Sequence, residues 1–244
     1  MRTVLGLCLA AGAAAVFLGC GASGSGGREV DITQAKDGCT PTSIQATAGE
    51  KLDLVVKNES GEDYEIEGID GAKLEEAIIP EGRTRSVGYD VPGSGGTTKL
   101  KCYIPGGVST IIEVQAGEGS TTPEPGAKEI SNGFAGGAVA GSTVEVSLGE
   151  YTVNADPPSV SAGEVEFVAT NVGKEVHELY VLKPKGNGYD VVGEVEHIGA
   201  GGSGSMTLKM TPGEYTLACL IAAGESGSTV DHFKEGMHTP FEVR

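Results

Sequence analysis

Four nitrogen- and sulfur-bearing side chains in the last third of the chain could together bind a metal ion. They are His177 in "EVHELYVL", Cys219 in "EYTLACL", and His232 and Met237 in "VDHFKEGMHTPFEVR". Two imidazoles, a thiolate and a weakly bound thioether are the donors of copper sites that transfer electrons. The residue types therefore predict one soft-metal site, provided that the fold brings three distant segments together.

The local patterns indicate where these four side chains lie. In "EYTLACL" the apolar residues alternate, which places Cys219 on the inward face at the end of a strand. His177 begins a strand directly after a glycine-containing turn, and His232 and Met237 belong to one loop before the closing strand "FEVR". We expect all four at one end of a β-sandwich.

Each of these residues also has a purely structural interpretation. A buried cysteine often acts as a small hydrophobic residue of the core, and a methionine often fills a gap there. In the same way, His177 could only form hydrogen bonds at a strand edge, and Met237 could only pack.

The composition predicts an all-β protein. The 244 residues include 40 glycines and 11 prolines, which separate short runs rich in Val, Leu, Ile, Thr and Tyr. Seventeen basic and 34 acidic residues give a net charge of -17. This charge argues against nucleic acid as a partner and favours a basic or cationic one.

An internal repeat organises the chain. "ATAGEKLDLVVKNESGEDYEIE" (46–67) and "VSAGEVEFVATNVGKEVHELYV" (160–181) share an Ala-Gly-Glu start, an apolar strand, an Asn and a turn. A second correspondence pairs "TKLKCYIPGG" with "YTLACLIAAG" and sets Cys102 opposite Cys219. Repeated units of this size predict two similar domains.

Turn residues at short intervals predict a Greek-key β-sandwich in each unit. We place the first domain at 29–117 and the second at 142–244, joined by a linker rich in Gly, Pro, Ser and Thr at 118–141. Each domain is long enough to bury its own core.

The N-terminus predicts export. Residues 1–19 form an apolar stretch after Arg2, which is typical of a bacterial signal peptide and too short to span a bilayer. The "FLGC" sequence resembles a lipoprotein processing site, which implies lipidation of Cys20 and a flexible tether over 20–28. We expect an extracytoplasmic protein anchored to the bacterial cell membrane; a plain secretory signal is the alternative.

Cysteine use fits this location. With Cys8 removed in the signal peptide and Cys20 lipidated, three cysteines remain: Cys39, Cys102 and Cys219. Cysteine pairs usually oxidise outside the cytoplasm, so an odd number leaves one thiol for another purpose.

The second domain resembles the blue-copper cupredoxins of the plastocyanin and azurin type. "NVGKEVH" is similar to their turn before the first histidine ligand, and "HFKEGM" repeats their His-to-Met spacing. The resemblance implies His177, Cys219, His232 and Met237 as ligands of one type 1 copper. Twelve residues separate Cys219 from His232, more than in familiar members, and His238 is a possible alternative ligand.

The first domain contains none of the four histidines. Its "DGCTPTSI" and "LKCYIPGG" resemble the cupredoxin-like domain of the periplasmic component of bacterial ferrous-iron uptake systems. That resemblance implies Cys39, Glu65, Glu67 and Cys102 as a metal site, although Leu100 stands where that family has methionine. The alternative is a disulfide between Cys39 and Cys102.

Three functions remain open from the sequence. The first is an electron carrier that uses copper in the second domain and passes electrons through the ring edge of His232 to a redox partner protein. The second is a metal-binding or delivery module beside a copper or iron transport component. The third is a structural pair of surface sandwiches. The chain lacks His-x-His pairs, a Gly-x-Ser-x-Gly elbow and a Walker loop, which predicts that it is not an enzyme.

Overall fold

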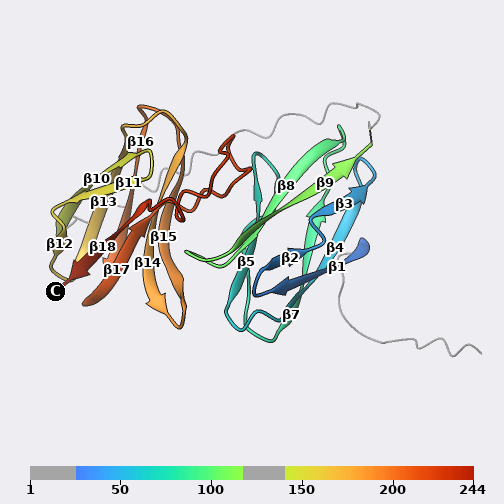
Figure 1. The fold of residues 1–244 in the computed structure, drawn as a ribbon, viewed down its shortest axis with the longest axis horizontal. Helices are drawn as coiled ribbons and strands as arrows, with labels where there is room; N and C mark the ends of the chain where they lie inside the picture. The colour runs from blue at the N-terminus through green and yellow to red at the C-terminus, as the bar shows by residue number, and fades with distance from the viewer. Residues whose placement is uncertain (1–25, 118–140) are drawn as a thin grey trace, which may run out of the picture.

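The protein consists of two β-sandwiches side by side (Figure 1). The computed structural model describes residues 26–117 and 141–244, and every regular element in them is a strand. The predicted signal peptide, the lipidation at Cys20 and most of the predicted linker lie outside the described residues. In the part that is described, no helix has the length and apolar character needed to cross a membrane.

The first domain contains two mixed sheets, each with one parallel pair of strands among antiparallel ones. One sheet has the strand order β2-β1-β4-β7 and the other the order β3-β9-β8-β5-β6. The strands are β1 (Arg28–Ala35), β2 (Gly38–Thr40), β3 (Ser43–Ala46), β4 (Lys51–Asn58), β5 (Tyr64–Ile69), β6 (Ala77–Ile79), β7 (Thr84–Asp90), β8 (Gly96–Tyr103) and β9 (Ser109–Ala116).

The second domain repeats this arrangement, with the sheets β11-β10-β13-β16 and β12-β18-β17-β14-β15. Its strands are β10 (Ser142–Gly149), β11 (Thr152–Asp156), β12 (Ser159–Val160), β13 (Gly163–Asn171), β14 (His177–Lys185), β15 (Gly188–Ile198), β16 (Ser203–Met210), β17 (Gly213–Ala218) and β18 (His238–Val243).

The two topologies match strand for strand. The first strand of each domain pairs in parallel with the fourth, β1 with β4 and β10 with β13, and the remaining neighbours follow the same order. The prediction of two cupredoxin-like Greek-key sandwiches is therefore confirmed. The repeat seen in the sequence reflects the repeated fold.

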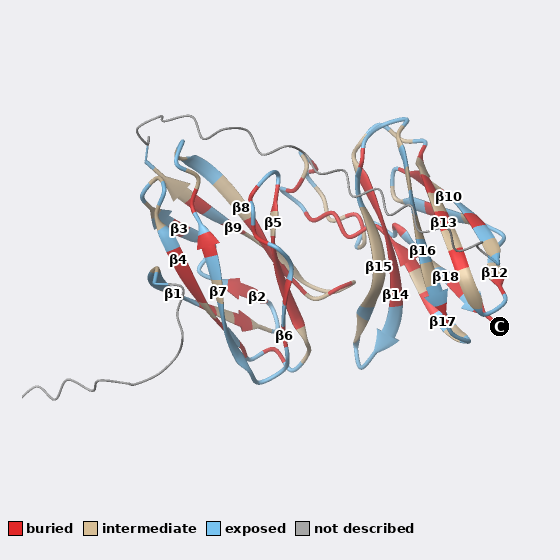
Figure 2. Ribbon diagram, turned by 180° about the vertical axis from the view of Figure 1, so that it is seen from behind, coloured by how far each residue is buried: buried red, intermediate tan, exposed pale blue. Residues whose placement is uncertain are grey.

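Each domain buries its own core between its two sheets, as Figure 2 shows. In β13 the apolar residues Val165, Phe167 and Ala169 are fully buried and alternate with partly exposed ones. This pattern is that of a strand with one face against the core. Cys219 and Met237 both belong to the core cluster of the second domain.

The five-stranded sheets of the two domains face each other. In β14 the residues from His177 to Leu182 are all buried. Leu179 and Val181 face the core of their own domain, whereas Tyr180 and Leu182 pack against Tyr103 of the first domain. The run "HELYVL" lacks polar and apolar alternation because both faces of this strand are covered.

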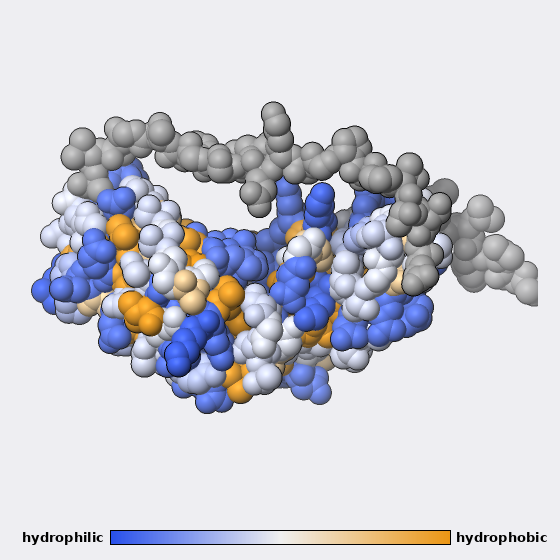
Figure 3. Space-filling model, turned by 90° about the horizontal axis from the view of Figure 1, so that it is seen from above, coloured by the Kyte–Doolittle hydropathy of each residue, from blue (hydrophilic) through white to orange (hydrophobic). Residues whose placement is uncertain are grey.

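The surface is largely polar. Seen from above, hydrophilic residues cover much of both domains, and small hydrophobic groups are scattered among them (Figure 3). Large apolar side chains that are exposed are Ile78 and Val172. This surface accords with the net charge of -17.

Candidate metal centre

Three strands of one sheet bring the predicted ligands to the same end of the second domain. His177 is the first residue of β14, Cys219 directly follows the last residue of β17, and His232 and Met237 lie in the connection between β17 and β18. Because β17 lies between β14 and β18, the ends of these segments are neighbours. Tyr180 and His238 both pair with Ala218, which precedes the cysteine.

The side chains of His177, Cys219 and His232 converge. Each offers one ligand atom, and these atoms all lie within 4.8 Å of one another. Cys219 Sγ is 3.4 Å from His232 Nδ1, and the ring centroids of the two histidines are 5.2 Å apart. All three residues are 0% exposed, so water does not compete for these donors.

His177 has the polar atoms that most require a partner. Both ring nitrogens are buried, and neither forms a hydrogen bond. Leaving such groups unpaired costs about 1–3 kcal/mol each. Burial, and then the neighbouring His232, lowers the pKa of His177, so the ring is neutral and a nitrogen lone pair is available to a metal ion.

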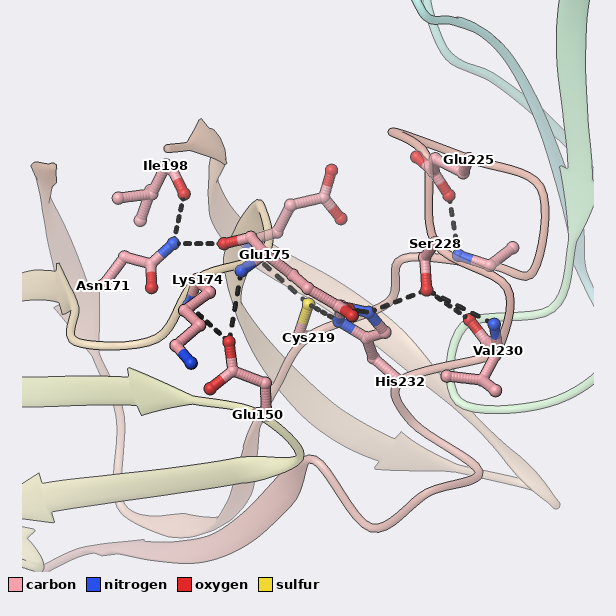
Figure 4. Close-up of polar contacts among 12 residues, drawn as sticks. Glu150, Asn171, Lys174, Glu175, Ile198, Cys219, Glu225, Ser228, Val230 and His232 are labelled. Atoms are coloured by element: carbon pink, nitrogen blue, oxygen red, sulfur yellow. Dashed lines mark hydrogen bonds and ion pairs between the residues drawn. The ribbon is translucent and has the colours of Figure 1, made fainter. Parts of the chain in front are cut away.

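His232 is held by its other nitrogen. Its Nε2 lies 3.1 Å from Glu175 Oε2 and 3.1 Å from Ser228 Oγ (Figure 4). A proton on Nε2 that is donated to these oxygens leaves the Nδ1 lone pair directed at the cysteine sulfur. Burial lowers the pKa of His232, which also favours the neutral ring. Glu175 and Ser228 therefore fix the orientation that metal binding requires.

Cys219 is a buried thiol in the absence of a metal. Burial, followed by the nearby Glu178 carboxyl, raises its pKa to about 12. The backbone N–H of Glu178 lies 3.4 Å from Sγ and can donate to it. A soft cation would replace the thiol proton, because metals bind the thiolate. Two neutral imidazoles, together with the thiolate that remains when the proton is displaced, are donors that suit a copper ion.

Met237 is hydrogen-bonded through its backbone to Cys219 and His232. It is 0% exposed and packs in the same core cluster as Cys219. Its backbone N–H donates to the His232 carbonyl at 2.9 Å, and its carbonyl accepts from the Cys219 N–H at 3.0 Å. The Met237 backbone thus ties two of the donor residues together.

An asparagine fixes the turn that precedes His177. The Asn171 side-chain amide donates to the carbonyls of Glu175 and Ile198, each at 2.7 Å, and its Oδ1 accepts from the Gly173 N–H at 2.9 Å. These bonds close the turn over Val172 to Val176 and aim His177 inward. The "NVGKEVH" motif has a clear local function in this turn.

Glu150 braces the same turn from the neighbouring sheet. Its Oε1 accepts hydrogen bonds from the backbone N–H groups of Lys174 and Glu175 (Figure 4). These bonds hold the pKa of Glu150 well below its usual range, at about 2. Glu175, which orients His232, is therefore held at its backbone as well.

The remaining histidine near the site does not join it. His238 is exposed, and its ring stacks on Phe233 with centroids 4.5 Å apart. Within the described residues, the group of possible ligands that converges contains His177, Cys219 and His232 and leaves out His238.

In the first domain, Cys39 and Cys102 form a disulfide. Glu65 and Glu67 do not gather around it. Cys102 pairs with Ile66 on the neighbouring strand and faces the core, and the residues on either side of Ile66 point to the opposite face. That face is turned toward the second domain. The two sulfurs and two carboxylates implied by the iron-uptake resemblance are thus separated by the sheet.

Two residues that orient the site could not be identified from sequence patterns. Glu175 stands two positions before His177 and Ser228 four before His232, and both contact the His232 ring. The ring edge of His232, predicted as the exit for electrons, is covered by these residues and by Tyr151, whose ring centroid is 5.5 Å away. Such contacts depend on loop conformations that local patterns do not encode.

No family model and no curated protein matches the sequence. Among solved structures, a dithionite-reduced auracyanin from Roseiflexus castenholzii matches with 17% identity and a TM-score of 0.34, covering 43% of this chain and 98% of that one. A blue copper oxidase from Nitrosomonas europaea matches with 12% identity and a TM-score of 0.31, covering 88% and 85%.

A multicopper oxidase from Pediococcus acidilactici matches with 11% identity and a TM-score of 0.34, covering 88% of this chain and 58% of that one. The prediction that the chain is not an enzyme is contradicted by these similarities, since structures matched over both domains are oxidases. That prediction is withdrawn. The comparison of the first domain with the iron-uptake component stays a prediction.

Proposed function

We propose that this protein binds one copper ion as a type 1 centre in its second domain and serves as an electron carrier. The observation that carries this proposal is the convergence of the His177, Cys219 and His232 ligand atoms within 4.8 Å in a fully buried position. A bound cation would also give a partner to one of the two buried, unpaired nitrogens of His177. Met237 is the fourth ligand by its place in the same loop.

When bound, copper supplies a one-electron couple between Cu(II) and Cu(I). The chain supplies a rigid and dry ligand set. Cys219 and Met237 are joined through the backbone at 3.0 Å, and Glu175 and Ser228 hold the His232 ring. Ligands that move little between oxidation states favour fast electron transfer, because less reorganisation accompanies each step.

Glu175 connects the buried His232 ring with the protein surface. Its carboxylate contacts His232 Nε2, and its side chain is 42% exposed. Electrons would therefore pass from the His232 ring over its contact with Glu175 or Tyr151 to a partner docked at this end. The net charge of -17 favours a basic redox partner.

Loading the purified full chain with Cu(II) tests the proposal. We expect an intense blue colour, because a thiolate bound to Cu(II) gives a strong charge-transfer band, and reversible bleaching by a reductant. Cys219→Ser should remove the band completely, and His177→Asn should remove or strongly shift it. His197→Asn and His238→Asn, which change exposed histidines of the same domain, serve as matched controls and should leave the colour unchanged.

The other outcomes are informative. A colourless protein that still binds copper would favour a metal-binding or delivery module beside a transport component. A protein that binds no copper or other soft metal would leave a structural pair of sandwiches.

We also propose that the protein is extracytoplasmic and attached to the cell membrane through a lipid on Cys20. The support is the apolar N-terminal stretch that ends in this cysteine. Cells that make the protein and receive a labelled fatty acid should label it, and Cys20→Ser should release it from the membrane fraction. If the unchanged chain carries no label and is found outside the membrane fraction, a plain secretory signal is favoured.

A further inference from the structure

The loop that carries His232 rests on the first domain. Twelve residues, Leu220 to Asp231, separate Cys219 from His232 and form no strand. In Figure 1 this segment, drawn in red, extends from the second domain toward β5 and β8 of the first. A loop of this length has no intrinsic reason to hold one conformation, so its contacts must define where His232 lies.

The outer part of the loop is bound through its backbone. Lys99 Nζ donates to the Gly224 carbonyl at 2.6 Å, and Asp70 Oδ1 accepts from the Ser226 N–H at 2.8 Å. Lys99 and Asp70 form an ion pair at 2.9 Å with each other. Two side chains of the first domain thus grip two peptide groups of the second.

The same segment is also bound through the Glu225 side chain, which belongs to a buried ion cluster. Lys101 Nζ of the first domain lies 3.2 Å from Glu225 Oε2 in the loop and 3.3 Å from Glu67 Oε1 of its own sheet. The side chains of Lys101 and Glu225 are 0% and 1% exposed. Removing one partner of such a pair leaves the other charge buried without compensation, which is strongly unfavourable.

The charges around Lys101 favour its ionised form. Burial alone lowers the pKa of this amine, but the carboxylates of Glu178, Glu225 and Glu67 outweigh burial, and the net pKa is raised. Among the described residues within reach of Glu225, Lys101 is the cation that pairs with it.

Glu225 is connected to His232 by a short series of hydrogen bonds. Its Oε2 accepts from the Ala222 N–H at 2.8 Å, and its carbonyl accepts from the Ser228 N–H at 2.8 Å. Ser228 Oγ in turn contacts His232 Nε2 at 3.1 Å (Figure 4). Displacing Glu225 therefore displaces the serine that orients the histidine.

We propose that the first domain acts as the support of the metal-binding loop, with Lys101 as the positioning residue that anchors Glu225 and, through Ser228, orients His232. The part that concerns copper rests on the proposed function. The part that concerns the loop does not, because it applies equally to the metal-free protein. This assignment gives the histidine-free first domain a specific function in the chemistry of the second.

Hydrogen exchange of the metal-free full chain tests the loop. In Lys101→Met we expect the amides of Gly224, Glu225 and Ser228 to exchange at least about tenfold faster than in the unchanged protein, since their bonds open more often. Lys101→Arg keeps the charge and should restore most of the protection. Two matched controls should leave these amides unchanged: Lys51→Met, in an exposed ion pair of the first domain, and Lys185→Met, in an exposed contact between the domains.

Copper-loaded samples give a second reading. Lys101→Met should shift the energy of the blue band or the reduction potential, whereas Lys51→Met and Lys185→Met should not. If Lys101→Met raises exchange throughout the second domain, Lys99→Met provides the test, because the Lys99 side chain is partly exposed and its replacement removes the bond to Gly224 and the ion pair with Asp70 without leaving a buried charge unpaired. Unchanged loop exchange in both the Lys101→Met and Lys99→Met chains would overturn the proposal.

The two proposals fail in different ways. A chain that binds no copper, but whose loop amides lose protection in Lys101→Met, retains the supporting function of the first domain and loses the copper site. A blue chain with unaltered loop exchange, band and potential in Lys101→Met keeps the copper site and loses the support.

Discussion

The two domains carry a buried cysteine at the same place and use it differently. Cys102 lies opposite Ile66 of β5, and Cys219 lies opposite the corresponding part of β14, one position beyond the pair of Ala218 with Tyr180. In the first domain the sulfur is in a disulfide, and in the second it is a free thiol near two imidazoles. The shared fold determines where the cysteine lies, and the residues around the cysteine determine whether its sulfur forms a disulfide or stays a free thiol.

Two substitutions account for most of the difference. Cys39 faces Gln34 on β1, and at the matching position of β11 Val153 faces Leu148. Tyr64 begins β5 six residues after Asn58, and His177 begins β14 six residues after Asn171. The first domain thus has a second cysteine but no imidazole at these positions, and the second domain has an imidazole but no second cysteine.

Loop length accounts for the rest. Five residues connect β8 to β9, whereas nineteen connect β17 to β18 and deliver His232 and Met237. Ordering the longer connection costs conformational entropy, and its contacts with the first domain offset that cost. The group of possible ligands is thus found in the domain whose connection is long and is docked on the other domain.

The largest effect should come from making the second domain resemble the first. Val153→Cys places a thiol where Cys39 stands in the first domain, so we expect a disulfide with Cys219 and complete loss of the blue colour. Titration of free thiols in the unfolded, metal-free chain measures the bond directly. A variant that keeps both a free Cys219 and its colour would show that the two positions are not equivalent in space.

The reverse change affects stability and leaves the metal site intact. In Cys39→Ser/Cys102→Ser the cross-link over a separation of 63 residues is lost, and the free energy of unfolding of the first domain should fall by about 2–4 kcal/mol. Urea unfolding measures this. Copper binding should persist in conditions where the first domain remains folded, and a loss of colour there would mean that the disulfide acts on the site.

Replacing the two turn asparagines distinguishes an effect on stability from an effect on the metal site. Asn58 donates to the carbonyls of Glu62 and Ile79 at 2.7 and 2.8 Å, as Asn171 does to Glu175 and Ile198. Asn58→Ala and Asn171→Ala should each lower the free energy of unfolding by about 1–3 kcal/mol, because buried carbonyls lose their donors.

Copper affinity distinguishes these two variants. It should fall by about tenfold or more in Asn171→Ala only, since that turn positions His177 and Glu175. Competition with a copper chelator measures the affinity. Equal affinities would remove the turn from the metal site.

The last effect concerns the facing sheets and is confined to a range of pH. Burial, followed by contact with Glu76, raises the pKa of Glu65 from 4.5 to about 9. A folded-state pKa above the unfolded value means that the associated stability is complete below about pH 4.5 and is lost as the pH rises toward 9.

Glu65→Gln cannot ionise and avoids this loss. Relative to the unchanged chain, its free energy of unfolding should therefore improve as the pH rises from 5 to 8, by up to about 1.4 kcal/mol per pH unit. Urea unfolding at several pH values provides the measurement. A difference between the two chains that is independent of pH would argue against ionisation of Glu65 in this range.

Much of the architecture could be predicted because it depends on local sequence patterns. Alternation in "EYTLACL" indicates the inward direction of Cys219, and the Asn-to-His spacing of "NVGKEVH" is repeated in the first domain as Asn58 to Tyr64. Such patterns reflect strand and turn geometry over a few residues, which each segment carries by itself. The residue types available to a metal are likewise plain in the chain.

The tertiary structure alone decided how those residues are supported. Lys101 and Glu225 meet although 124 positions separate them, and Glu175 reaches His232 across 57. The sequence marks Lys101 only as a lysine in a strand. Its burial follows from the approach of the second domain's sheet, whose strand β14 ("HELYVL") is in turn covered on one face by its own core and on the other by the first domain. Burial and ion pairing are properties of surfaces in contact, so they exist only once the two sandwiches and their loop have come together.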